Sequence, residues 1–327
     1  MSEYKGLMVF AEQREGKIHP VSFELLGKGK AIAGQLGIDV SAVLIGSDMQ
    51  AEAKELIYYG ADTVYLYDDP ALKDFDVLNY KHNIVRLVRE VKPEILLLGA
   101  THLGRSLGPR ISVTLDTGLT ADCTGLEVDD EGNLVQVRPA FSGNILAYIR
   151  TSTRPQMATI RYKVMKAGDR DESRKGEIEQ KDVELIDPLM VLAEKEKVGG
   201  VNVAEADILV CGGRGVKKPD DFGILQELAD TVGGVVGCSR PLVDDGWFGK
   251  ERQVGFSGNT VKPRLYVACG ISGSPQHLAG MRDSDTILAI NSDPSAPIFK
   301  VADYGVVGDL YEVLPELTKR IQGRQGK

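Results

Sequence analysis

The chain alternates short apolar runs with longer segments whose apolar residues recur at helical spacing. In the N-terminal part, runs at 6–13, 40–45, 63–67 and 94–99 predict strands. The segments 20–36, 51–59, 77–90 and 104–115 predict helices, and Gly37 follows the first of them, where a helix end favours glycine. Strands that alternate with helices of this length predict a parallel sheet covered on both faces.

Between residues 121 and 162 this pattern changes. Short β-like runs at 122–128, 134–138, 145–150 and 157–161 follow one another without intervening helices. They predict an antiparallel addition to the same domain. Residues 169–182 are nearly all charged or polar. For them we favour a solvated loop over a partner-binding face.

The alternation of strands and helices stops and then restarts in the last third of the chain. Residues 189–203 carry alternating charges followed by two glycines, which predicts a connection between domains. Strands are then predicted at 206–211, 234–238, 264–269 and 286–291, and helices at 220–232, 275–281 and 308–322. We therefore predict a two-domain α/β protein: a parallel-sheet domain with an antiparallel addition over 1–200, and a domain with a five-stranded parallel sheet over 201–327.

Composition narrows the classes of function. The net charge of −8 and the lack of a Lys/Arg cluster argue against nucleic-acid binding. No apolar run approaches the roughly 20 residues of a membrane span, and the start does not resemble a signal peptide. The cysteines are far apart in the sequence, which argues against a disulfide framework or a zinc site. We expect a cytoplasmic protein with reduced cysteines at Cys123, Cys211, Cys238 and Cys269.

Candidate binding residues follow the predicted strands of the second domain, because open α/β sheets bind ligands outside the carboxyl ends of their strands. Arg214 and Lys217 lie in a glycine-rich turn after the first of these strands, which suits either a phosphate site or a basic surface turn. Ser239 and Arg240 follow the second strand. The guanidinium of Arg240 is a fixed cation.

The strongest signal is the segment 269–281. Gly270 and Gly273 permit a tight turn, and Ser272 or Ser274 can cap a helix that begins at Pro275. The N-terminus of such a helix offers free N–H groups to a pyrophosphate. Because Gln276 and His277 lie in its first turn, we interpret His277 as a ligand contact rather than a structural histidine.

Further candidates flank this segment. Gly255 and Gly258 surround Phe256 and Ser257 in a loop that can wrap a flat ligand, and Asn291 ends a strand. Asp303 or Asp309 can contact a ribose or adenine, or can cap a helix. The chain contains no G-x-G-x-x-G fingerprint, P-loop or Ser-His-Asp signal.

Residues 212–317 closely resemble the FAD-binding domain of the electron transfer flavoprotein alpha subunit. The matching segments are GRGVKK at 213–218, CSRPLVDDGW at 238–247, VKPRLYVACGISGSPQHLAGM at 261–281, AINSDPSAPIF at 289–299 and VADYGVVGDL at 301–310. The segment 99–126 resembles the first domain of the same family. Its turn GATHLGRSLG also resembles a nucleotide loop, for which we favour a structural or interface role.

The resemblance implies a set of FAD contacts. It places Arg214 near the pyrophosphate, and Ser239 and Arg240 beside the isoalloxazine and ribityl groups. A family segment that often reads VGQT is replaced here by the loop Val254, Gly255, Phe256 and Ser257. Ser257 keeps a hydroxyl for flavin N5, whereas Phe256 lacks the side-chain amide of the glutamine. The remaining implied contacts are Ser272, Gly273, Ser274, Pro275, Gln276 and His277 around the pyrophosphate and ring edge, and Asn291, Asp309 and Leu310 at the adenosine end.

The resemblance also implies a function. The chain would be the FAD-carrying subunit of a heterodimer that passes single electrons between a partner flavin, or a dehydrogenase of the acyl-CoA type, and an acceptor through a stabilised flavin semiquinone. It would have no substrate chemistry of its own. The residue that matches His277 faces the N1–O2 edge of the flavin in this family, and the one that matches Arg240 lies over the ring.

The first domain would pack against a beta subunit that holds AMP or a second FAD, and the FAD domain would swivel on 189–203. A variant of this function is NADH-dependent electron bifurcation. The alternatives are a nucleotide-binding regulatory module and an NADP-binding domain of the transhydrogenase type on the same fold.

Overall fold

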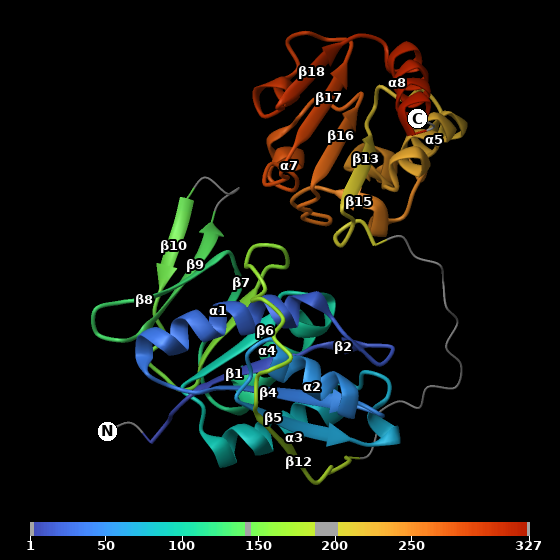
Figure 1. Cartoon of the computed structure of the whole chain (residues 1–327). Helices are drawn as coiled ribbons and strands as arrows, with labels where there is room; N and C mark the ends of the chain where they lie inside the picture. Colours follow the sequence, from blue (N-terminus) through green and yellow to red (C-terminus); the bar gives the residue numbers. More distant parts are fainter. Residues whose placement is uncertain (1–2, 141–144, 187–201, 326–327) are drawn as a thin grey trace. The chain divides into compact units, whose positions relative to one another are not determined.

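The computed structural model describes residues 3–140, 145–186 and 202–325. The chain divides into two compact units, Met1–Ala193 and Glu194–Lys327, and each has its own sheet (Figure 1). The predicted domain boundary after residue 200 and most of the predicted connection 189–203 lie outside the described residues.

The first unit is built on seven parallel strands in the order β12-β5-β4-β1-β6-β11-β7. These strands are β1 (Leu7–Ala11), β4 (Val40–Gly46), β5 (Thr63–Asp68), β6 (Ile95–Gly99), β7 (Leu119–Cys123), β11 (Gln156–Ile160) and β12 (Glu177–Gln180). The helices are α1 (Pro20–Leu36), α2 (Gln50–Tyr58), α3 (Val77–Val91) and α4 (His102–Thr114). A short hairpin of β2 (Gln13–Arg14) and β3 (Lys17–Ile18) follows β1.

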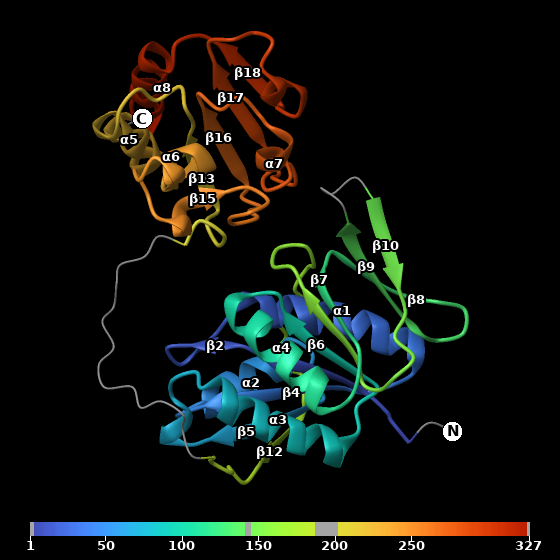
Figure 2. The ribbon, with the colours of Figure 1, turned by 180° about the vertical axis from the view of Figure 1, so that it is seen from behind.

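Both faces of this sheet are covered, as the sequence predicts. Leu7 and Val9 of β1 belong to one core with residues of α1 and α2, whereas Met8 and Phe10 belong to a second core with residues of α3 and α4. Figures 1 and 2 show the two helical layers from opposite sides. The helix α1 ends at Gly37 with a left-handed φ of 66°, which confirms the predicted helix end.

Three sequence predictions for this unit are wrong. The sequence places the runs at 122–128 and 157–161 in an antiparallel addition. However, Asp122 and Cys123 end β7 of the parallel sheet, and β11 is fully buried in that sheet between β6 and β7. The sequence also predicts a solvated loop over 169–182, but residues 177–180 form β12, which pairs with β5 at the sheet edge. Charged residues are common on edge strands because they discourage pairing with other chains.

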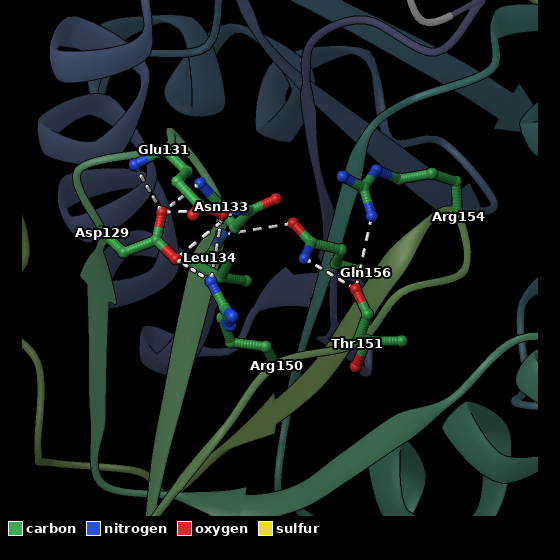
Figure 3. Close-up of polar contacts among 8 residues, drawn as sticks. All are labelled: Asp129, Glu131, Asn133, Leu134, Arg150, Thr151, Arg154 and Gln156. Carbon is green, nitrogen blue, oxygen red and sulfur yellow. Dashed lines mark hydrogen bonds and ion pairs between the residues drawn. The ribbon is translucent and has the colours of Figure 1, made fainter.

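The antiparallel addition itself has three strands, β8 (Gly125–Val128), β9 (Leu134–Ala140) and β10 (Ile145–Ile149). Figure 3 shows how polar contacts fix it to the parallel sheet. Gln156 of β11 accepts a hydrogen bond from the backbone N–H of Leu134 at 3.3 Å and donates to the carbonyl of Thr151 at 3.0 Å. Arg150 pairs with Asp129 at 2.7 Å, which joins the end of β10 to the β8–β9 turn.

The second unit holds six parallel strands in the order β15-β14-β13-β16-β17-β18. These strands are β13 (Ile208–Gly212), β14 (Val235–Ser239), β15 (Gln253–Val254), β16 (Leu265–Cys269), β17 (Ile287–Asn291) and β18 (Tyr304–Val307). Its helices are α5 (Phe222–Val232), α6 (Arg240–Asp244), α7 (Pro275–Leu278) and α8 (Leu310–Gln325).

The α/β class and the parallel sheet of this unit agree with the sequence prediction, but the sheet has six strands and not five. The strand β15 is only two residues long, and β18 (Tyr-Gly-Val-Val) is a short run interrupted by glycine whose residues are exposed, so neither has the length of a typical buried strand. Numbered within the unit, the strand order is 3-2-1-4-5-6, the doubly wound arrangement of dinucleotide-binding domains. No helix among the described residues is both long and apolar enough to cross a membrane.

Candidate functional site

A cavity of about 460 Å³ opens at the carboxyl ends of the strands in the second unit. The strand order reverses between β13 and β16, because β13 pairs with β14 on one side and with β16 on the other. Ligands of open α/β sheets bind at this reversal, where the loops that leave the two strands separate. The cavity therefore lies where the fold favours ligand binding.

The cavity brings together a large part of the predicted contact set. The predicted residues that line it are Arg214, Ser239, Ser272, Gly273, Ser274, His277, Asn291, Asp309 and Leu310. The predicted residues outside its lining are Arg240, Val254, Gly255, Phe256, Ser257, Pro275 and Gln276. The cavity is also lined by residues that the predicted contact set does not include: Gly213, Gly215, Lys217, Pro241, Gly270, Ile271, Ile290, Ser292, Asp293, Ala296 and Gly308. Their common signal is a position at or shortly after a strand end.

Glycines shape the base of the cavity. The N–H of Gly215 donates to the carbonyl of Gly270 at 3.0 Å, so the turns after β13 and β16 meet backbone to backbone. A Cβ atom on Gly215 would lie 2.7 Å from the Cα of Gly270, and Gly270 itself has a φ of +63°. Larger residues at either position would push the two turns apart.

The turn after β16 offers donors to an anion. Within the part of the chain that the structure describes, the backbone amides of Ser272, Gly273 and Ser274 donate to no protein acceptor. Successive amides in a turn with a left-handed residue form an anion-binding concavity, and Gly273 has a φ of +84°. The helix α7 is shorter than the predicted 275–281, so these donors come chiefly from the turn.

Arg214 adds a cation to the lining of the cavity. Its side chain is exposed and lines the cavity, and it forms no ion pair with any residue in the described ranges. A guanidinium and free backbone amides that line the same cavity suit a phosphate or pyrophosphate group. The residues of the cavity therefore fit the anionic part of a dinucleotide.

His277 lies at the cavity with one nitrogen bonded and one unpaired. Its side chain is 6% exposed, and its Nε2 lies 2.9 Å from the hydroxyl of Tyr266. Its Nδ1 is buried and has no hydrogen-bond partner among the described residues. Burial lowers the pKa of His277 to about 4, so the ring is neutral near pH 7. An unpaired buried polar atom is costly unless a ligand pairs with it.

Burial of His277 makes stability depend on pH. The ring takes up a proton near pH 6.5 when the chain is unfolded but only near pH 4 when the chain is folded. The folded state therefore loses stability as the pH falls through this window. Relative to His277→Asn, we expect the ligand-free wild type to lose about 3 kcal/mol of unfolding free energy between pH 7 and pH 4. Urea unfolding followed by the fluorescence of Trp247, the only tryptophan, measures this difference. Parallel pH profiles of the two proteins would contradict it.

Arg240 and the loop 254–257 border the cavity from outside. Arg240 is exposed and pairs with Asp244 at 3.2 Å, an interaction of the kind that contributes little at a surface. Val254 of β15 pairs with Ser239, and the N–H of Phe256 donates to the carbonyl of Gln276 at 2.8 Å. The loop is thus attached to two segments that do line the cavity.

Three polar side chains at or after the end of β17 form hydrogen bonds to the protein backbone. The amide of Asn291 donates to the carbonyl of Ile271 at 2.9 Å, and the carboxylate of Asp309 accepts from the N–H of Tyr311 at 2.9 Å at the start of α8. Asp303 accepts from the N–H of Ile287 and does not line the cavity. Asn291 and Asp309 therefore have structural roles in addition to any ligand contact.

The corresponding strand reversal of the first unit is occupied by a carboxylate. Glu12, at the end of β1, is fully buried, accepts a hydrogen bond from Thr101 and pairs with Arg14 at 2.8 Å. A Cβ atom on Gly104 would lie 1.8 Å from the carbonyl oxygen of Gly99, so this glycine lets α4 pack against β6. A buried acidic group opposes a nucleotide phosphate, which favours the structural role of the GATHLGRSLG turn.

No group of side chains suited to a metal ion occurs among the described residues. The four cysteines are buried and free, and burial raises the pKa of the Cys123, Cys238 and Cys269 thiols to about 12. Protonated thiols are poor nucleophiles and poor metal ligands. We therefore assign the cysteines to packing.

Comparison with known proteins gives matches over both units. Residues 7–186 match the family model of the electron transfer flavoprotein domain, and residues 202–282 match that of the electron transfer flavoprotein FAD-binding domain. The chain is 50% identical to the electron transfer flavoprotein subunit alpha of Thermoanaerobacterium thermosaccharolyticum, over 98% of this chain and 99% of the relative. It is 49% identical to the same subunit of Megasphaera elsdenii, over 100% and 99%.

A third relative has a different name. It is the LctC subunit of the lactate dehydrogenase (NAD(+),ferredoxin) of Acetobacterium woodii, and it is 47% identical over 98% of this chain and 78% of the relative. Relatives of comparable identity thus include both electron transfer flavoprotein alpha subunits and a subunit of a lactate dehydrogenase.

Proposed function

Since the chain belongs to the electron transfer flavoprotein alpha-subunit family, we propose that it is the FAD-carrying subunit of a heterodimer that relays single electrons between a partner flavin, or a dehydrogenase of the acyl-CoA type, and an acceptor. The observation that carries this proposal is the cavity at the strand reversal of the second unit, with the guanidinium of Arg214 and with backbone amides and an Nδ1 of His277 that have no partner among the described residues. Bound FAD would supply the electron chemistry, including a stabilised one-electron-reduced state.

The residues of the site divide into three parts in this proposal. Arg214 and the amides of Ser272, Gly273 and Ser274 bind the pyrophosphate. Asn291, Asp309 and Leu310 bind the adenosine end. The flavin ring is contacted by Ser239, Arg240, Val254, Gly255, Phe256, Ser257, Pro275, Gln276 and His277. Phe256 is 68% exposed, which supports a contact between its ring and a flat ligand.

The first unit has an exposed apolar surface that suits a partner. Ile145, Leu146 and Tyr148 of β10 are 54%, 52% and 61% exposed. They lie on the strand pair β9–β10, which projects from the body of this unit (Figure 1). Clustered exposed apolar side chains usually mark interaction surfaces. We propose that the first unit packs against the beta subunit.

The proposal is tested by co-expressing the chain with its genomic neighbour, purifying the complex and counting flavins per heterodimer during an NADH titration. One FAD that NADH does not reduce supports a carrier that a dehydrogenase supplies with electrons. A colourless complex would support the nucleotide-binding regulatory module, and selective binding of NADP would support the transhydrogenase-type domain. Either of these two results would overturn the proposed function.

A second candidate is a role in electron bifurcation. It is favoured by the 47% identity to a subunit of an enzyme whose name includes both NAD(+) and ferredoxin. Two FADs per heterodimer with rapid reduction by NADH would support this candidate, with the present chain holding the relay flavin.

Removal of Arg214, which lines the cavity together with Lys217, is expected to weaken FAD binding. For Arg214→Ala we expect the dissociation constant for FAD to rise about tenfold or more, because a hydrogen bond to a charged group contributes about 1.5–3 kcal/mol. Fluorescence titration of the apo complex with FAD measures this constant. Arg320→Ala removes an exposed arginine of α8 that pairs with Glu316 and serves as the matched control. Equal affinities for the two variants would exclude Arg214 as a phosphate ligand.

A further inference from the structure

Behind the cavity, two buried polar side chains form a pair. Tyr266 of β16 is fully buried, and its hydroxyl lies 2.9 Å from Nε2 of His277 on α7. Because Nε2 is bonded to Tyr266, Nδ1 is the ring nitrogen left for a ligand of the cavity. The chemistry that His277 offers this ligand depends on which of its two nitrogens carries the proton.

A neutral imidazole has one N–H donor and one acceptor nitrogen, and the partner of one nitrogen fixes the state of the other. The ring is neutral because burial lowers the pKa of His277, and the Tyr266 hydroxyl stays protonated because burial raises its pKa well above 10. The pair therefore has two possible arrangements. Either the hydroxyl donates to Nε2 and the proton lies on Nδ1, or an Nε2–H donates to the hydroxyl oxygen and Nδ1 is a bare acceptor.

The surroundings of the pair favour the first arrangement. In the second, the hydroxyl proton would need another acceptor, and among the described residues the other side chain that hydrogen-bonds to the Tyr266 hydroxyl is the buried thiol of Cys211. Thiol sulfur is a weak acceptor, whereas an imidazole nitrogen is a strong one. The backbone of Val254 also raises the pKa of the ring, which favours a protonated ring nitrogen but not one nitrogen over the other. By distance and angle, Nδ1 has no hydrogen-bond partner among the described residues.

We propose that Tyr266 is a positioning residue: its hydroxyl donates to Nε2 of His277 and holds the ring in the Nδ1–H tautomer, so that the cavity receives a donor and not an acceptor. This inference rests on the proposed function, because the acceptor it implies is an edge of the bound flavin that gains negative charge on reduction. Tyr266 itself does not line the cavity. It acts on the cofactor only through His277.

The tautomer can be measured directly in the FAD-loaded heterodimer. The chain has four histidines, so ¹⁵N-histidine labelling and two-bond ¹H–¹⁵N correlation give few signals, and His277→Asn identifies the one from His277. We expect the Nδ1–H pattern in the wild type and an Nε2–H or averaged pattern in Tyr266→Phe. Tyr311→Phe is the matched control, because its hydroxyl is bonded to Asp221 and Lys217 in the same unit and not to His277.

A second measurement separates positioning from a general structural effect. The amide of asparagine places an N–H near the position of Nδ1, whereas that of glutamine places it near Nε2. We expect the first reduction potential of the bound FAD to be unchanged in His277→Asn and lowered in His277→Gln. For Tyr266→Phe we expect the first reduction equilibrium to weaken about two- to twelvefold, as for loss of one neutral hydrogen bond.

The outcomes also distinguish this inference from the proposed function. An Nε2–H pattern in the wild type, or an unchanged pattern in Tyr266→Phe, overturns the inference even if one FAD is bound. A heterodimer that binds no FAD overturns the proposed function instead. If Tyr266→Phe fails to fold, the wild-type pattern and the His277→Asn and His277→Gln pair still decide the question.

Discussion

Replacement of His277 with alanine is expected to lower the first one-electron potential of the bound FAD by about 60–130 mV. The side chain is neutral, lines the cavity and has one unpaired nitrogen. A hydrogen bond from this nitrogen to a group that becomes negatively charged contributes about 1.5–3 kcal/mol, and about 1.4 kcal/mol corresponds to about 59 mV for one electron. Spectroelectrochemical titration of the purified heterodimer measures the change.

The low pKa of His277 adds a second expectation. Because the ring is already neutral well below pH 7, the difference between wild type and His277→Ala should be constant between pH 6 and pH 8. A cationic histidine would instead give a difference that shrinks as the ring loses its proton. His82→Ala, which removes a partly buried histidine from the first unit, is the control. An unchanged potential in His277→Ala would show that Nδ1 does not contact the part of the flavin that is reduced.

The sequence predicts local structure better than strand pairing. The helix α1 has the predicted bounds, and β6 and β16 lie within a residue of their predicted positions. Apolar runs and helix ends are local signals, so they can be read from neighbouring residues. Strand order is set by contacts between distant segments, and the 3-2-1-4-5-6 order that creates the site follows from no single run.

The wrong predictions concern segments whose tertiary partners override local composition. Residues 177–180 contain one apolar side chain, Ile178, among two glutamates and a glutamine, yet they form β12 because β5 offers an open edge. The run at 157–161 follows three short β-like runs and resembles them in length, yet its strand β11 is fully buried between β6 and β7. Neither partner is visible in the local sequence pattern.

In the candidate site, too, residues with a local sequence signal could be predicted and residues that depend on tertiary contacts could not. Arg214, Ser272 and His277 could be predicted because polar residues and glycines at strand ends are visible in the sequence. Tyr266 could not, because in a strand of apolar neighbours it resembles an ordinary core residue. Its hydroxyl gains a role only once α7 places His277 beside it. Residues that act through others thus require the structure.

Replacement of Gly215 with alanine is expected to weaken FAD binding about 5- to 150-fold. The new Cβ atom would lie 2.7 Å from the Cα of Gly270, so the turns after β13 and β16 must separate, and the Gly215–Gly270 hydrogen bond must lengthen. Forcing an extra carbon into a tightly packed contact costs about 1–3 kcal/mol. The separation displaces the start of the turn that carries the free amides of Ser272, Gly273 and Ser274.

Gly223→Ala is the matched control, because a Cβ atom at this position in α5 meets nothing within 4 Å and alanine favours a helix. Both variants should keep the far-ultraviolet circular dichroism of the wild type, and FAD fluorescence titration of each apo heterodimer then gives the two dissociation constants. Wild-type affinity in a folded Gly215→Ala would mean that the cofactor does not depend on the contact between these turns. The pyrophosphate would then bind away from the strand reversal. A selective loss in Gly215→Ala would instead identify the backbone contact between β13 and β16 as the element that holds the cofactor site in shape.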